Sequence, residues 1–108
     1  MKKIVLAVAL TVTLCSCTSK VNLLNWVKEP APLESIAVSE TIGFGTTQLN
    51  CMRVAGPGFY GGCAYVVTDC VDTPSNCKGV PVRCDIWLAF DWDYLRAHEL
   101  HHCQGYGH

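Results

Sequence analysis

Six cysteines in the later part of this 108-residue chain restrict its possible folds more than any other feature of the sequence. They are Cys51, Cys63, Cys70, Cys77, Cys84 and Cys103. An even number of cysteines in a short chain is typical of small exported domains that are braced by disulfides. A second metal site built from cysteine thiolates is the alternative, and it would require a reducing compartment.

The spacing of these cysteines favours a hairpin. Four of them recur every seven residues, but Pro74, Gly79 and Pro81 in the same stretch exclude a continuous helix. A hairpin whose turn is flanked by two of the cysteines accounts better for this spacing. Six cysteines allow 15 pairings, and the sequence does not decide between them. Our working prediction is Cys70–Cys77 on either side of the turn, together with Cys51–Cys63 and Cys84–Cys103.

The first residues of the chain are typical of an export signal. Lys2 and Lys3 precede an apolar run over residues 4–14, which is shorter than the roughly 20 residues that a membrane-spanning helix needs. The run ends in Leu-Cys-Ser-Cys, which resembles a bacterial lipobox with Cys17 as the lipid-modified residue. Because Thr18 rather than an aspartate follows Cys17, the resemblance implies an outer-membrane lipoprotein that faces the periplasm. An ordinary cleaved signal with an incidental cysteine is the alternative.

These features divide the chain into three parts. We expect a signal peptide at residues 1–16, a lipid-anchored tether at residues 17–34 and a disulfide-rich domain at residues 35–108. A domain of this size buries little apolar surface and usually needs covalent or metal braces. Without Lys2 and Lys3 the chain has six basic and nine acidic side chains and no basic cluster, so we expect no nucleic-acid partner.

Most of the domain has the pattern of strands and turns. Runs rich in apolar, β-branched and aromatic residues predict four strands, at residues 35–38, 48–54, 64–68 and 80–90. Pro81 near the start of the last run favours an edge position for that strand. Turn-forming residues separate the runs, and the expected sheet is antiparallel.

The last part of the chain has the pattern of a helix. Residues 94–103 contain no Gly or Pro, and Asp91 or Asp93 can cap the helix by accepting hydrogen bonds from its free N–H groups. Gly105 ends the helix, because glycine readily adopts the left-handed conformation of a C-terminal turn. We therefore expect an α+β fold, in which a small disulfide-braced antiparallel sheet packs on one C-terminal helix.

All four histidines of the protein lie on or just after this helix. At about 100° per residue, His98 and His102 lie on one stripe of the helix, with Glu99 beside that stripe. His108 follows the turn and can approach the same point from outside the helix. Three imidazoles arranged in this way bind Zn²⁺ at about 2.0–2.1 Å and leave one coordination position open.

The two residues between these positions lie elsewhere on the helical wheel. Leu100, about 200° from His98, is expected to pack against the sheet, and His101, at about 300°, is expected to be solvated. A histidine-rich tail that binds metals adventitiously is the alternative to a specific site. The match at every fixed position of the motif argues against it.

The sequence HELHHCQGYGH resembles HExxHxxGxxH, the zinc-binding consensus of the metzincin metallopeptidases. The resemblance implies a minimal zincin-like fold in which His98, His102 and His108 bind zinc. It also implies that Glu99 is the general base, which takes a proton from a zinc-activated water and passes it to the leaving amine. In that family a strand that pairs with the substrate precedes the active-site helix, and residues 85–90 are the candidate here.

The resemblance ends at His108. Metzincins continue into a turn that carries a methionine beneath the metal and then into a lower subdomain, whereas the methionines of this sequence are Met1 and Met52. A partner subunit that supplies the second wall of the site is therefore one interpretation.

The leading interpretation is an envelope-anchored zinc peptidase that acts on proteins or peptides and contacts the membrane through lipid on Cys17. One alternative is a disulfide-rich outer-membrane lipoprotein that serves as a binding or envelope-accessory module, with zinc structural or absent. A zinc-storage protein is another. Glu99 at the general-base position favours catalysis over both, because neither binding nor storage requires it.

Overall fold

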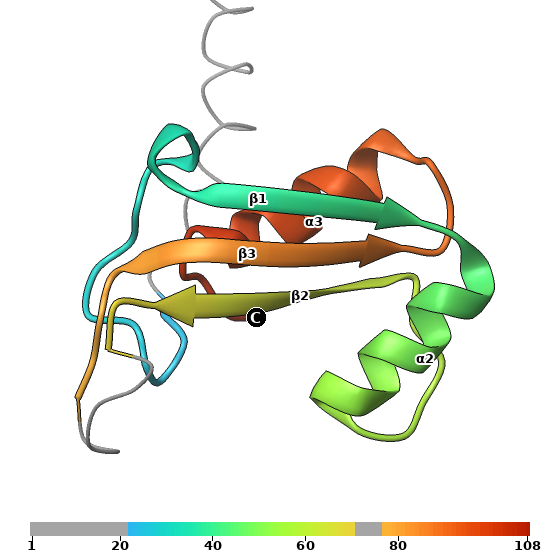
Figure 1. Cartoon of the computed structure of the whole chain (residues 1–108), viewed down its shortest axis with the longest axis horizontal. Helices are drawn as coiled ribbons and strands as arrows, with labels where there is room; N and C mark the ends of the chain where they lie inside the picture. The colour runs from blue at the N-terminus through green and yellow to red at the C-terminus, as the bar shows by residue number, and fades with distance from the viewer. Residues whose placement is uncertain (1–21, 71–76) are drawn as a thin grey trace, which may run out of the picture.

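The computed structural model describes residues 22–70 and 77–108, which form a small α+β fold around one three-stranded sheet (Figure 1). The elements are η2 (Leu33–Ser35), β1 (Ala37–Ile42), α2 (Phe44–Ala55), β2 (Gly62–Thr68), β3 (Pro81–Leu88) and α3 (Asp93–Cys103). The expected signal peptide, the lipidation residue Cys17 and the turn at residues 72–76 lie outside the described residues. Within the described part, no helix is long and apolar enough to cross a bilayer.

The sheet is mixed, and the prediction of a purely antiparallel sheet is wrong. β2 and β3 form an antiparallel hairpin, whereas β1 pairs with β3 in parallel, with Ala37 opposite Arg83. The strand order β1-β3-β2 puts β3 in the centre, so the edge position predicted for this strand is also wrong. Pro81 is accommodated because it is the first residue of β3 and lies opposite Thr68, where the register shifts.

Residues 48–54, which were predicted to form a strand, belong to helix α2. Gln48 and Cys51 are buried on its inner side, three residues apart as on one face of a helix. The Gln48 side chain donates to the Tyr60 carbonyl at 2.7 Å and accepts from the Tyr60 N–H at 2.9 Å. These bonds and the disulfide from Cys51 to Cys63 stabilise the helix, although the local composition favours a strand.

All three predicted disulfides are present. Two pairs join a helix to a strand and the third closes the connection between β2 and β3: Cys51–Cys63, Cys84–Cys103 and Cys70–Cys77, respectively. A disulfide typically stabilises a small domain by about 2–4 kcal/mol. The covalent frame thus supports a sheet that has few apolar residues to bury.

α3 covers one face of the sheet, behind the strands in Figure 1, and the core lies between them. Leu100 of α3 packs against this core, as its place on the helical wheel predicts. The buried members of the core are Ala31, Ile36, Cys84, Ile86 and Cys103. The core therefore includes the disulfide that holds the end of α3 to the central strand.

Residues 22–31, within the expected tether, lie beside the chain that follows α3. Leu23 forms an antiparallel bridge with Tyr106, although the two residues are far apart in the sequence. Val27 and Ala31 are each only 3% exposed. This part of the chain is thus packed against the domain from Leu23 onward.

Candidate metal centre

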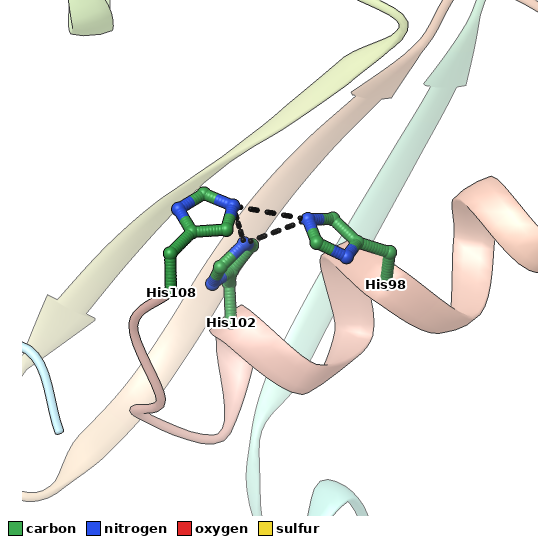
Figure 2. Close-up of side chains that lie close together, drawn as sticks. All are labelled: His98, His102 and His108. Carbon is green, nitrogen blue, oxygen red and sulfur yellow. Dashed lines mark hydrogen bonds between the residues drawn. The ribbon is translucent and has the colours of Figure 1, made fainter. Parts of the chain in front are cut away.

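α3 and the chain after it bring three imidazoles together at one point (Figure 2). His98 and His102 lie one turn apart on α3, and His108 lies beyond the turn at Gly105. The Nε2 atom of His98 is 3.1 Å from that of His102 and 3.2 Å from that of His108. The Nε2 atoms of His102 and His108 are also 3.2 Å apart. The structure therefore arranges all three predicted ligands so that they could hold one metal ion.

The turn at Gly105 directs His108 back towards the helix. Gly105 has a φ of 115°, in the left-handed region that residues with a side chain rarely adopt. Its Cα also lies so close to Val27 that an added Cβ would be 2.8 Å from Val27 Cγ1. The backbone conformation and the packing both require glycine, which confirms the role predicted for this position.

A hydrogen bond within the same turn orients the ring of His102. Its Nδ1 is 2.7 Å from the carbonyl oxygen of Tyr106. A carbonyl oxygen only accepts hydrogen bonds, so this Nδ1 carries a proton, and the lone pair of the neutral ring is on Nε2. Nε2 is the atom that faces the other two histidines, and metal-binding imidazoles are commonly oriented in this way.

The start of α3 is fixed by Arg96 and not by an aspartate cap. Trp92 is the N-cap residue, and its side chain makes no capping hydrogen bond. The carboxylates of Asp91 and Asp93, one of which was expected to cap the helix, instead pair with Arg96, which also pairs with Glu40 of β1 at 2.8 Å. The predicted cap is therefore wrong, because a guanidinium is a stronger partner for a carboxylate than a free backbone N–H. Arg96 thereby ties α3 to β1.

His101 lies apart from the three converging histidines. Its ring stacks on that of Tyr106, with ring centroids 4.5 Å apart and 20° between the planes. The side chain was predicted to be solvated, and the stacking leaves it partly buried.

The surroundings of the cluster favour neutral imidazoles. Burial lowers the pKa of His98, and the nearby His108 and His101 lower it further. Burial also lowers the pKa of His102, while its hydrogen bond to Tyr106 acts in the opposite direction. A neutral imidazole is the form that binds a metal ion, so these shifts favour metal binding near neutral pH.

Glu99 is buried next to the histidines. Only 4% of the residue is exposed, and its Oε1 has no hydrogen-bond partner among the described residues. Burial raises the pKa of Glu99 to about 7. Burying a carboxyl group without a partner costs free energy. The presence of Glu99 at this position is therefore not explained by the stability of the fold.

A cleft of about 480 Å³ opens at the three histidines, and Glu99 also lines it. Sequence reasoning did not identify the rest of its lining. Leu24 and Trp26 contribute one part, and Val54 and Phe59, from the end of α2 and the loop after it, contribute another. These residues are apolar, so the cleft combines a polar cluster with apolar walls, as ligand-binding sites usually do.

β2, and not the predicted residues 85–90, is the strand beside the histidines. Residues 85–90 overlap β3, which is paired with a strand on each side. β2 forms an edge of the described sheet, and Gly62, Ala64 and Val66 of this strand line the cleft. The prediction is wrong because the strand that precedes the helix in the sequence lies in the middle of the sheet. The pair of glycines at the start of β2 was the sequence signal for this strand, since glycine in a strand often marks a site where a ligand or another backbone approaches closely.

Comparison with known proteins gives no family for this chain: no family model matches it, and no curated protein or solved structure is significantly similar to it. Any function proposed for this chain therefore has to rest on the geometry of the site. The described residues form a small disulfide-braced α+β fold in which three histidines could bind a metal ion.

Proposed function

We propose that this protein is a zinc-dependent peptidase in which Glu99 is the general base and His98, His102 and His108 bind Zn²⁺. The observation that carries the proposal is the convergence of three Nε2 atoms, 3.1–3.2 Å apart, on a cleft that Glu99 also lines. The spacing HExxHxxGxxH, which resembles the metzincin consensus, supports the same assignment.

The three histidines fit a zinc ion. Two nitrogen ligands of a tetrahedral zinc ion, each at about 2.0–2.1 Å from the metal, lie about 3.3 Å from each other. The separations between the Nε2 atoms here, 3.1–3.2 Å, are close to this value. Three protein ligands leave one position for water or substrate, which is typical of catalytic zinc sites. The unpartnered Oε1 of Glu99 supports catalysis, because a structural site needs no buried carboxyl group.

The edge of β2 offers a place for an extended peptide. Gly61 accepts a hydrogen bond from the Ala89 N–H at 2.8 Å, so alternate residues from Gly61 onward direct their backbone groups to β3. The N–H and C=O groups of Gly62, Ala64 and Val66 consequently point to the open edge, and these residues line the cleft. A substrate that adds a strand here satisfies those groups and brings its backbone to the histidines.

Glu99 supplies the proton transfers that hydrolysis of an amide requires. When bound, Zn²⁺ supplies Lewis acidity, which polarises the scissile carbonyl and makes water a stronger acid. The Glu99 carboxylate accepts a proton from water as the water oxygen attacks the carbonyl carbon. It then donates that proton to the nitrogen as the C–N bond breaks, which yields a carboxylic acid and an amine.

The proposed location of this activity is the bacterial cell envelope, with lipid on Cys17 holding the protein to the periplasmic side of the outer membrane. The lipobox-like residues that end at Cys17 support the anchor, and the three disulfides fit an oxidising compartment. The variant Cys17→Ser should lose lipid, as measured by mass spectrometry, and leave the membrane fraction. A lipid-modified Cys17→Ser protein would contradict this assignment.

A second candidate function is a binding module with a structural metal ion. An exposed row of aromatic rings favours it, with successive ring centroids 6.1, 4.7 and 6.1 Å apart. Its members are Phe44, Phe90, Trp92 and Tyr94. Clustered aromatic side chains at a surface are typical of sites that bind other proteins. In this case the metal would brace the C-terminal segment, and Glu99 would be dispensable.

The variant Glu99→Gln separates the two candidates. We would purify the oxidised protein, measure its zinc content and follow the cleavage of a mixture of denatured proteins. For a peptidase, both wild type and Glu99→Gln should bind zinc, and of these two only wild type should cleave. His102→Ala should neither bind zinc nor cleave. His101→Ala is the matched control, because it removes an imidazole of the same helix outside the cluster. Zinc-loaded wild type that cleaves nothing would favour the binding module, and absence of zinc would contradict both candidates.

A further inference from the structure

The segment at residues 22–27, which we call the strap, pairs with the chain that carries the third histidine. The Leu24 N–H donates to the carbonyl of Gly105 at 2.9 Å, and the Gly107 N–H donates to the carbonyl of Asn22 at 2.6 Å. These two bonds have opposite directions, as in an antiparallel pair of strands. The strap therefore holds the residues on both sides of Tyr106.

The strap is connected in this way to two of the three histidines. The Asn22 side chain donates to the backbone carbonyl of His108 at 3.4 Å, next to the imidazole that the chain delivers. Leu23 forms a bridge with Tyr106, and the Tyr106 carbonyl is the acceptor that orients His102. Displacement of the strap would therefore free His108 and remove the support of the Tyr106 carbonyl.

The chain that the strap holds has little conformational restraint of its own. It contains Gly105 and Gly107, and glycine loses more conformational freedom on folding than any other residue. The strap supplies the restraint, since its buried Val27 contacts Gly105 and the Leu24 side chain lies beside Gly107. Leu24 and Trp26 also form part of the cleft wall, so one segment both holds a ligand and lines the site.

We infer that docking of the strap and binding of the metal ion are coupled, with the strap as a positioning element for His108 and His102. By thermodynamic linkage, if docking raises the metal affinity, a bound metal ion must stabilise docking by the same factor. A bound metal ion then also stabilises the part of the cleft wall made by Leu24 and Trp26. The inference rests on the metal site of the proposed function and is independent of hydrolysis.

A pair of substitutions at Leu24 tests one direction of the coupling. Leu24→Pro removes the N–H that bonds to Gly105, whereas the matched control Leu24→Ala keeps it. Competition with a chelator should show about 10- to 100-fold weaker zinc binding for Leu24→Pro, the usual effect of losing support for a ligand. Leu24→Ala should lose less affinity than Leu24→Pro, because it keeps the N–H and removes only the side chain beside Gly107. In a His108→Ala background the difference between the two variants should become smaller, because the strap then supports only His102, through Tyr106.

Hydrogen exchange of the wild-type protein tests the other direction. Zinc should slow the exchange of the Leu24 and Gly107 amides and should not do so in His108→Ala. This measurement also decides the question if Leu24→Pro fails to fold or to form its disulfides.

The outcomes separate this inference from the proposed function. Equal zinc affinities for folded Leu24→Pro and Leu24→Ala, or zinc binding without protection of the two amides, would overturn the coupling and leave the peptidase proposal standing. Zinc-dependent protection in a protein that cleaves nothing would keep the coupling and remove the peptidase proposal. A protein that binds no zinc would remove both.

Discussion

The carboxyl group of Glu99 lies against Gly62, where a Cβ added to the glycine would be 3.2 Å from Oε2 of Glu99. The same Cβ would lie 2.9 Å from the carbonyl oxygen of Trp87, a backbone atom of the central strand. A backbone atom cannot move away as a flexible side chain can. Gly62 is therefore the position at which the edge strand approaches both β3 and the proposed general base.

The variant Gly62→Ala should consequently lose both stability and activity. The added methyl group forces β2 away from β3, and overpacking of this kind typically costs about 1–3 kcal/mol. Urea unfolding would measure the stability, and kcat/KM on a peptide substrate would measure the effect on Glu99. Gly61→Ala is the matched control, because its Cβ would meet only the Leu95 side-chain end at 3.3 Å. Equal effects of the two substitutions would contradict this account of Gly62.

In the metal-free protein the contribution of Glu99 to stability should fall as the pH rises from about 4.5 to about 7, and the lowered pKa values of His98 and His102 act in the opposite direction. Burial raises the pKa of this carboxyl to about 7 from its ordinary value of 4.5, so the folded state retains a proton that the unfolded state releases. The contribution of Glu99 to stability is fully present below pH 4.5 and is lost as the pH rises through 7, and solvent screening keeps the loss below about 3 kcal/mol. Thermal melts of wild type and Glu99→Gln, both with a chelator, would measure the difference. A difference that stays constant across this range would argue against a buried, unpaired carboxyl.

Removal of metal should destabilise the protein through the three histidines. A ligand present at about 100 times its dissociation constant stabilises the folded state by about 2.7 kcal/mol. A chelator should therefore lower the Tm of wild type and of His101→Ala by several degrees and leave that of His102→Ala unchanged. Calorimetry with and without zinc would measure these shifts. A chelator effect that persists in His102→Ala would place the metal elsewhere in the protein.

Loss of the Cys84–Cys103 disulfide should weaken both the fold and the metal site. Both cysteines are fully buried, and Cys103 directly follows His102. Replacing the pair by alanines should cost about 2–5 kcal/mol and lower the zinc affinity, because the end of α3 is no longer fixed to β3. The control is the pair Cys70–Cys77, which closes the β2–β3 connection away from the cleft. Removing the control pair should leave the zinc affinity unchanged, as a chelator competition would show.

The convergence of the three histidines could be predicted because the signal for it is local. His98 and His102 share a stripe on any helix that forms over these residues, and Gly105 allows the turn that returns His108. The Cys70–Cys77 pair was predictable for a related reason, since a hairpin between β2 and β3 brings its flanking cysteines together.

The parts that sequence reasoning got wrong depend on contacts between distant residues. α2 replaces the strand expected at residues 48–54 because Gln48 binds Tyr60, a contact that no local pattern reports. The predicted Cys51–Cys63 pair does not decide between a helix and a strand at Cys51. The central position of β3 follows from its parallel pairing with β1, because strand order is a property of the whole sheet. The pairing of the strap was likewise not predicted, since its partners lie at the other end of the chain.

The histidines and Glu99 come from one continuous stretch of eleven residues, whereas the walls of the cleft come from three other segments of the chain. Substitutions in those segments can therefore change which molecules enter without moving a ligand atom. Under the proposed function, selectivity can therefore change through the cleft walls while the histidines and Glu99 stay the same. The eleven-residue stretch could also be transferred to another scaffold. That scaffold would have to provide the end of a helix, an adjoining strand that fixes it, and a segment that pairs with the residues after the helix.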